Sequence, residues 1–315
     1  MSIRTDPAVH VETPRRPLTA WIPPHVGVAA AIVGLLPWLI TGMRLPLQNL
    51  WATETLPDRM PIVLLPFSQY ALTLIAALIV IGAAAAALAV RATRVRRSRR
   101  GVIATFIGLL ATQVIAVAQT ATVVRGGLAD RAESELYFAA VLAVAALAIL
   151  VGTGVFWLIA VARRAGALIG LAIAAIAFGP WLNGLLVPMG TIPADWIGQL
   201  AGYTHWVPPI LVGVAIAWCG LGTIGRVIAA AASLLLLWTA PALITGVTSA
   251  AGSRVMATVP LEMLDYAARV TGMALFLPEL ALPPMIVAVV VAAAGLAARA
   301  IFRRRLSVAA GRLES

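Results

Sequence analysis

The chain has 315 residues, of which 62% are hydrophobic and only 11% are charged. Soluble domains are about half apolar and a quarter charged, so this composition excludes an ordinary soluble globule and also a disordered chain. The net charge of +11 comes from 23 arginines and no lysine. Arginines beside membrane spans explain such an excess better than nucleic-acid binding does, so no nucleic acid is expected as a partner.

Hydropathy in chain order predicts one all-α, polytopic integral membrane domain over residues 26–300. Residues 1–25 are expected to form a cytoplasmic tail, because Asp6, Glu12 and several prolines precede the first apolar stretch, which is unlike a cleaved signal peptide. Residues 301–315 form a second, basic tail. About eight stretches approach the roughly 20 residues that cross a bilayer as a helix. They are 26–43, 66–90, 102–124, 138–162, 166–187, 207–225, 227–247 and 280–300.

The arginines predict the orientation of these spans. Seventeen of them fall on the side of the two tails and six on the other side, whereas nine of the twelve acidic residues fall on that other side. The positive-inside rule therefore places both termini in the cytoplasm, with the protein in the plasma (inner) membrane of a bacterium. The outer loops are long, at 44–65, 125–137, 188–206 and 248–279. Because long loops often carry function, the outer face is the expected working face.

An internal repeat is also expected. The first span contains Pro37-Trp38-Leu39 and the fifth contains Pro180-Trp181-Leu182, each in the outer half of an outward-running helix. Two four-helix halves would match the parallel repeats of several transporter folds. Coincidence in a chain rich in Ala, Leu and Trp is the alternative explanation.

The third span is the most polar one. Gln113 and Thr120 are seven residues apart, as are Thr112 and Gln119, so each pair shares a helix face. This face is a candidate lining for a polar cavity, and hydrogen bonding between helices is the competing interpretation. Asn183 is a further candidate, because it follows Pro180 at an expected helix break.

The fourth outer loop contains an amphipathic stretch at 260–269. Glu262, Asp265 and Arg269 recur at helical spacing opposite Leu261 and Leu264, and Asp265 with Arg269 is a favourable pair one turn apart. The pattern predicts a helix lying on the membrane surface. It would serve as a lid or docking surface for a partner protein at the outer face, or as a packed structural cap.

The third outer loop offers Asp195 and His205, which could form an acid–base pair. The aromatic residues around them are typical of the headgroup belt, which is the simpler interpretation. No nucleophile motif accompanies the pair, and no catalytic residue is assigned.

The arginine run after the second span is expected to contact anionic headgroups of membrane lipids. Its candidate residues are Arg94, Arg96, Arg97, Arg99 and Arg100. The alternative is that these arginines only set the orientation of the spans in the membrane.

No cofactor and no metal site is expected. The single cysteine, Cys219, excludes an intrachain disulfide and any site with several cysteines, and the three histidines are scattered. Nucleotide-binding and hydrolase motifs do not occur in a usable setting.

Three functions remain open. The first is a channel-like or carrier-like transporter of a small neutral or lipidic solute, favoured by the repeat, by the prolines in odd-numbered spans and by the polar third span. The second is a non-catalytic anchor or assembly partner of a larger complex, favoured by the near absence of charge within the spans. The third is a lipid- or glycan-modifying enzyme that uses outer-loop carboxylates.

Overall fold

The structure is a computed structural model, and it describes residues 22–93, 99–189, 191–253 and 259–311. The described residues are almost entirely helical, and they contain only isolated β-bridges in place of strands. The all-α prediction is therefore confirmed. The helices are α1 (Ile22–Leu39), α2 (Leu72–Ala92), α3 (Arg99–Gly127), α4 (Ala132–Ala160), α5 (Arg164–Leu186), α6 (Asp195–Gly202), α7 (Val207–Cys219), α8 (Ile224–Gly252), α9 (Pro260–Phe276) and α10 (Pro278–Gly311), with short 3-10 turns η1 (Pro57–Arg59) and η2 (Thr204–Trp206).

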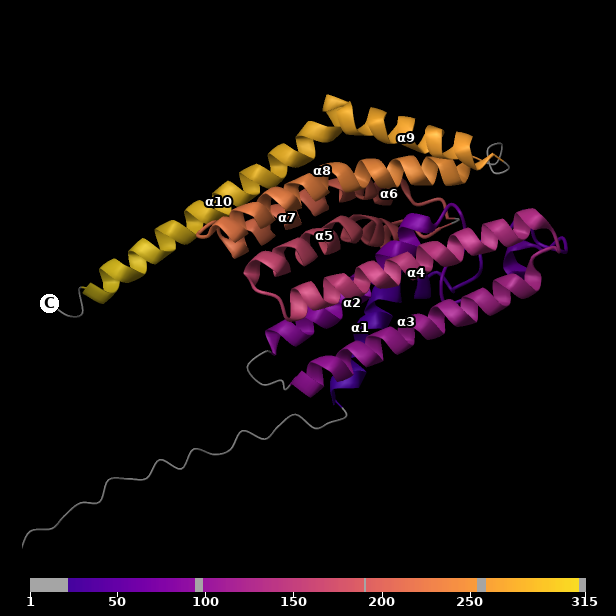
Figure 1. Cartoon of the computed structure of the whole chain (residues 1–315), viewed down its shortest axis with the longest axis horizontal. Helices are drawn as coiled ribbons and strands as arrows, with labels where there is room; N and C mark the ends of the chain where they lie inside the picture. The colour runs from indigo at the N-terminus through magenta and orange to yellow at the C-terminus, as the bar shows by residue number, and fades with distance from the viewer. Residues whose placement is uncertain (1–21, 94–98, 190, 254–258, 312–315) are drawn as a thin grey trace, which may run out of the picture.

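Seven helical segments of the described chain are long and apolar enough to cross a membrane. They include α2, α3, α4, α5 and α8 in full, the segment Asp195–Cys219 that combines α6, η2 and α7, and Pro278–Phe302 of α10. The apolar part of α1, Pro24–Leu39, is shorter. The protein is thus a multi-pass membrane bundle, in which the helices lie lengthwise beside one another (Figure 1).

Two predicted span boundaries are wrong for a common reason. The first span was expected to run to residue 43 and the second to begin at 66, but α1 ends at Leu39 and α2 begins at Leu72. The chain between them is apolar at 60–67, and hydropathy alone does not distinguish an apolar loop from an apolar helix. This stretch contains Pro61 and Pro66, and it is not helical. Proline has no amide hydrogen and disfavours helix in the residue before it, so this stretch forms a loop.

The packing order of the helices is the same in two halves of the chain. In the first half, α1 packs on α2 and α3, and α2 packs on α4. In the second half, α5 packs on α7 and α8, and α7 packs on α10. The two halves meet mainly where α5 lies against α2 and α4. This agreement supports the predicted repeat of four and four spans.

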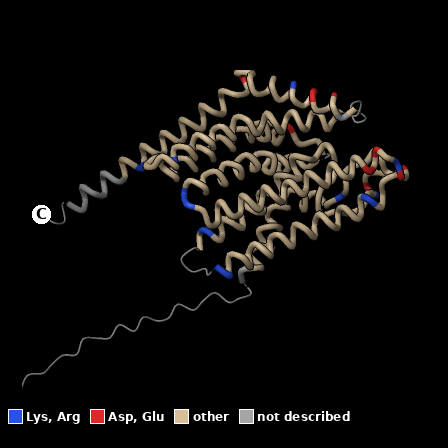
Figure 2. The backbone as a smooth tube through the Cα atoms, in the orientation of Figure 1, with Lys and Arg blue, Asp and Glu red and all other residues tan. Residues whose placement is uncertain are grey.

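Charge separates along the long axis of the bundle (Figure 2). Arg91, Arg163, Arg164 and Arg226 lie at or beside the ends of helices, and Arg299 lies within α10. Figure 2 shows one end of the bundle with basic positions and no acidic ones, here called the basic end. The acidic positions lie toward the opposite, acidic end and along α9. The distribution is that of a membrane protein whose spans are flanked by charge.

Glycine permits a close crossing of α1 and α2, which lies at Gly34 of α1. A Cβ on Gly34 would lie 2.6 Å from the Cα of Gly82 in α2 and would also collide with the carbonyl oxygen of Leu78. Helix α5 contacts the same residue, because the Trp181 indole of α5 donates a 2.8 Å hydrogen bond to the Gly34 carbonyl. Three helices are therefore held together at one residue.

Replacing Gly34 by Ala is expected to destabilise the protein by about 1–3 kcal/mol, because the added methyl group meets backbone atoms that cannot rotate away. Gly154→Ala is the matched control, since it lies in α4 with nothing within 4 Å of its added Cβ. A thiol-reactive fluorescent dye can follow thermal unfolding in detergent through Cys219, which is buried and is the only cysteine. Equal unfolding temperatures for the two variants would contradict the proposed close contact.

Candidate functional site

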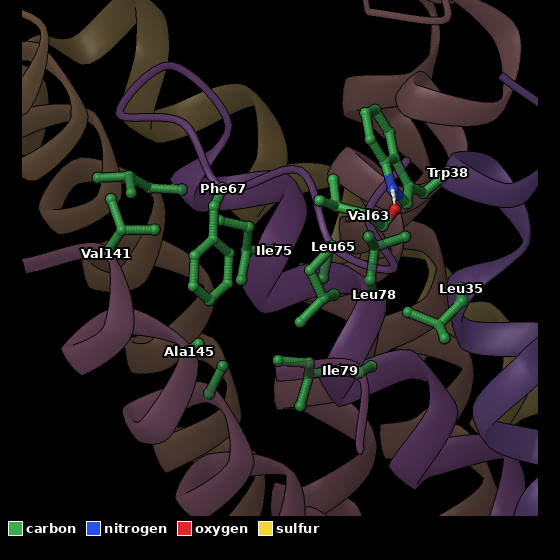
Figure 3. Close-up of a cluster of buried hydrophobic side chains, with 14 of the residues drawn as sticks. Leu35, Trp38, Val63, Leu65, Phe67, Ile75, Leu78, Ile79, Val141 and Ala145 are labelled. Carbon is green, nitrogen blue, oxygen red and sulfur yellow. Dashed lines mark hydrogen bonds between the residues drawn. The ribbon is translucent and has the colours of Figure 1, made fainter. Parts of the chain in front are cut away.

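The acidic end is built around the loop that joins α1 to α2. Its residues 60–67 are non-helical and largely apolar, and Met60, Val63, Leu65 and Phe67 are buried. They pack with Leu35 of α1, Ile75 and Leu78 of α2 and Val141 of α4 in one cluster (Figure 3). The loop is therefore part of the hydrophobic core and not a surface connection.

Buried backbone N–H and C=O groups that lie outside a helix need hydrogen-bond partners. Side chains of α3 bond to several such groups of this loop. Gln119 accepts a 2.9 Å hydrogen bond from the Leu64 amide and donates a 3.0 Å bond to the Ile62 carbonyl. Thr120 accepts a 3.0 Å bond from the Leu65 amide. These two side chains occupy the hydrogen-bonding positions that a neighbouring strand would otherwise fill.

Helices α1 and α4 complete the attachment of the loop. The Trp38 indole donates a 2.8 Å hydrogen bond to the buried Val63 carbonyl (Figure 3). Gln48 donates to the Phe67 carbonyl at 2.9 Å and accepts a 2.6 Å bond from the Tyr137 hydroxyl of α4. Gln48 and Tyr137 carry no local sequence signal that points to this contact, and the only signal for Trp38 is its place in the repeated Pro-Trp-Leu triplet.

The polar residues of the third span are thus engaged within the protein. Besides Gln119 and Thr120, the buried Gln113 donates a 2.9 Å bond to the Ile79 carbonyl of α2, and Thr112 bonds to the Gly108 carbonyl of its own helix. Three of these side chains, Gln113, Gln119 and Thr120, bond to other elements, as the interpretation of hydrogen bonding between helices predicted in place of a cavity. A cavity-lining role for the four residues and for Asn183, which is exposed, stays a prediction.

The structure does not join Asp195 to His205. Asp195 is exposed at the start of α6, and among the described residues no ion pair or hydrogen bond links it to His205. His205 instead lies with its ring centroid 4.5 Å from that of Trp206, and its Nδ1 pairs with the Gly202 carbonyl. The outer-loop carboxylates Glu54, Asp58 and Asp195 are likewise all exposed.

The predicted amphipathic helix exists as α9, and it packs lengthwise on α8 (Figure 1). Asp265 and Arg269 form the predicted pair at 3.0 Å, and both are exposed together with Glu262. Gly246 of α8 lies against Ala267, and Trp238 donates a 3.0 Å bond to the Leu275 carbonyl, so the two helices run antiparallel. The expectation of a helix lying flat on the membrane surface is therefore replaced by one that runs along a neighbouring helix.

The arginine run after α2 is only partly described. Arg94, Arg96 and Arg97 lie outside the described residues, and Arg99 and Arg100 are exposed at the start of α3. Lipid-headgroup contact by the run stays a prediction.

In residues 22–93, 99–189, 191–253 and 259–311, no three His, Cys, Asp or Glu side chains gather in an arrangement that could hold a metal ion. Comparison with protein-family models, with curated proteins and with solved structures gives no match to this chain.

Replacing Gln119 by Leu is expected to leave the Ile62 carbonyl and the Leu64 amide without their partner and to cost about 1–3 kcal/mol of stability. The loop should then open more readily, and trypsin should cut faster after the exposed Arg59. Thr122→Val is the matched control, because Thr122 bonds only to the Ala118 carbonyl of its own helix. The attachment would be disproved if both variants were cut at the rate of the unmodified protein.

Proposed function

We propose that the protein is a non-catalytic membrane scaffold that binds a partner protein through the outward face of α9. The observation that carries this proposal is that α9 has no counterpart in the first half. There α3 and α4 are joined by the short link 128–131, whereas α8 and α10 are separated by a loop that contains the 17-residue α9. Connection alone does not require this helix.

The helix is fixed in place rather than loosely attached. The Trp238 side chain of α8 both donates its hydrogen bond to Leu275 and packs edge-on against Phe276, with 6.4 Å between ring centroids. A Cβ on Gly246 would lie 2.6 Å from the Ala267 carbonyl oxygen. A surface held in this way is preorganised, which lowers the entropic cost of binding a partner.

The outward face of α9 combines apolar and charged groups. Leu261 and Leu264 are 80% and 66% exposed, and Glu262, Asp265 and Arg269 are exposed beside them. Apolar contacts supply affinity in a protein interface and charges supply orientation, so this mixture suits another protein better than lipid tails.

The length of α8 supports a position of this face of α9 outside the membrane, where a partner protein can reach it. The 29 residues of α8 extend about 43 Å at 1.5 Å per residue, whereas a bilayer core is about 30 Å thick. Gly246 lies within the last two turns of α8, and the charged part of α9 packs from this level toward the acidic end. The excess length of α8 supports a location of that part outside the hydrocarbon layer.

Site-specific photo-crosslinking tests the proposal in cells that produce the full chain. A photoreactive amino acid at Leu264 is expected to give a discrete protein adduct, which mass spectrometry identifies. Leu147 of α4 is the matched control, because it is 60% exposed but lies on a membrane-spanning helix away from α9. The Asp265→Arg variant should reduce the adduct by placing like charges one turn apart.

The scaffold proposal fails if Leu264 and Leu147 give the same products, or if Leu264 gives only lipid adducts. An adduct that persists unchanged in Asp265→Arg would show that the charged part of the face takes no part in binding.

A carrier for a small neutral solute is the second candidate, and the repeated packing order of the two halves favours it. Glycerol-driven swelling of proteoliposomes followed by light scattering separates the two proposals. A carrier for such a solute should swell faster than empty liposomes and should be altered by Gln113→Ala. The scaffold proposal expects the rate of empty liposomes for both forms.

A further inference from the structure

The basic end brings together arginines that lie far apart in the sequence. Trp218, near the end of α7, is contacted by arginines from three other helices: Arg91 at the end of α2 and Arg164 at the start of α5 lie over its ring, and Arg299 of α10 donates to its carbonyl. Arg226, in the first turn of α8, lies beside the turn that follows α7, where a Cβ on Gly222 would be 3.8 Å from its Nη1. Trp218 and these four arginines are here called the Trp218 cluster.

Two of these arginines hold the ends of helices. The Arg91 guanidinium donates to the Ile159 carbonyl at 2.6 Å, and Arg299 donates to the Trp218 carbonyl at 2.8 Å. Cations at helix C-termini are favourable because the last carbonyls have no partner within the helix. Arg91 also lies over the Trp218 ring, with its guanidinium carbon 5.1 Å from the centroid, and so connects the two halves of the bundle.

The other two arginines have donors available for a ligand. The Arg164 guanidinium carbon lies 5.9 Å from the centroid of the Trp218 ring, and neither the Arg164 nor the Arg226 guanidinium group donates a hydrogen bond to a described residue. Both ion pairs between described residues lie elsewhere, one between Arg125 and Glu135 and the other on α9. A guanidinium group presents five donors in a planar fork that matches phosphate oxygens.

Apolar groups adjoin this positive charge. Trp218 is 39% exposed, and Leu221 in the turn that follows α7 is 45% exposed. Tryptophan beside arginine at the end of a span is typical of the headgroup level of a bilayer. The cluster therefore combines cationic donors with exposed apolar side chains, and a phospholipid combines an anionic headgroup with apolar acyl chains.

We propose that the Trp218 cluster binds the phosphate-bearing headgroup of an anionic lipid, with Arg164 and Arg226 as its main donors. The positive N-terminal ends of α5 and α8, which begin at Arg164 and Ile224, add to the attraction for an anion. This site is separate from the arginine run at 94–100, and it does not depend on the scaffold function proposed above.

Native mass spectrometry of the full chain in mild detergent tests this site. Dioleoylphosphatidylglycerol and dioleoylphosphatidylcholine are titrated separately, because they share acyl chains and differ in headgroup charge. The unmodified protein should bind the anionic lipid more tightly. Each single variant, Arg164→Gln or Arg226→Gln, should weaken that binding about fivefold, and the double variant about 25-fold. Arg59→Gln with Arg131→Gln removes the same charge elsewhere and should leave it unchanged.

Three outcomes would overturn the proposal. Equal affinity of the unmodified protein for the two lipids would show that headgroup charge is not recognised, and this comparison needs no variant to fold. Equal weakening by the control variant would show attraction by net charge alone. Displacement of the lipid by 10 mM inorganic phosphate would identify a soluble anion as the ligand instead of a lipid.

Discussion

The need to pair every buried backbone group governs the architecture of this protein. Helices satisfy that need internally, but the non-helical stretch 60–67 does so only in part, and it lies in the core beside α1, α2 and α4. Its partners are the backbone of residues 43–45, with which it forms an antiparallel bridge, and side chains, above all Gln119, Thr120 and Trp38. The polarity of α3 and the position of Trp38 in α1 are therefore consequences of one loop that lies inside the bundle.

Composition and periodicity were sufficient to predict the all-helical membrane bundle and most of its spans, because a bilayer leaves few ways to satisfy a backbone. The repeat, which stays a prediction, was suggested by the Pro-Trp-Leu triplets around Trp38 and Trp181, but the two indoles bond to different elements, a loop carbonyl and the Gly34 carbonyl of α1. The Asp265–Arg269 pair followed directly from helical spacing.

Other features depend on contacts between distant segments and could not be predicted. Gln48 and Tyr137 are 89 residues apart, and nothing in either local sequence indicates that they meet. The Trp218 cluster combines arginines from four helices. Of these, only Arg91 lies next to the arginine run at 94–100, in which lipid contact was predicted. Likewise, the amphipathic pattern of α9 placed Leu261 and Leu264 on a face opposite the charges, but both are exposed beside the charges, and α8 packs at Ala267 and Thr271 instead.

The central position of α5 has a consequence for biosynthesis. Helices α1 to α4 find their principal partners within the first 160 residues, and α5 then packs on a face already formed by α2 and α4. Chains that emerge from the ribosome from the N-terminus onward commonly fold unit by unit. The first half can thus assemble while the second is still being translated, and it then serves as the template on which the later helices are inserted.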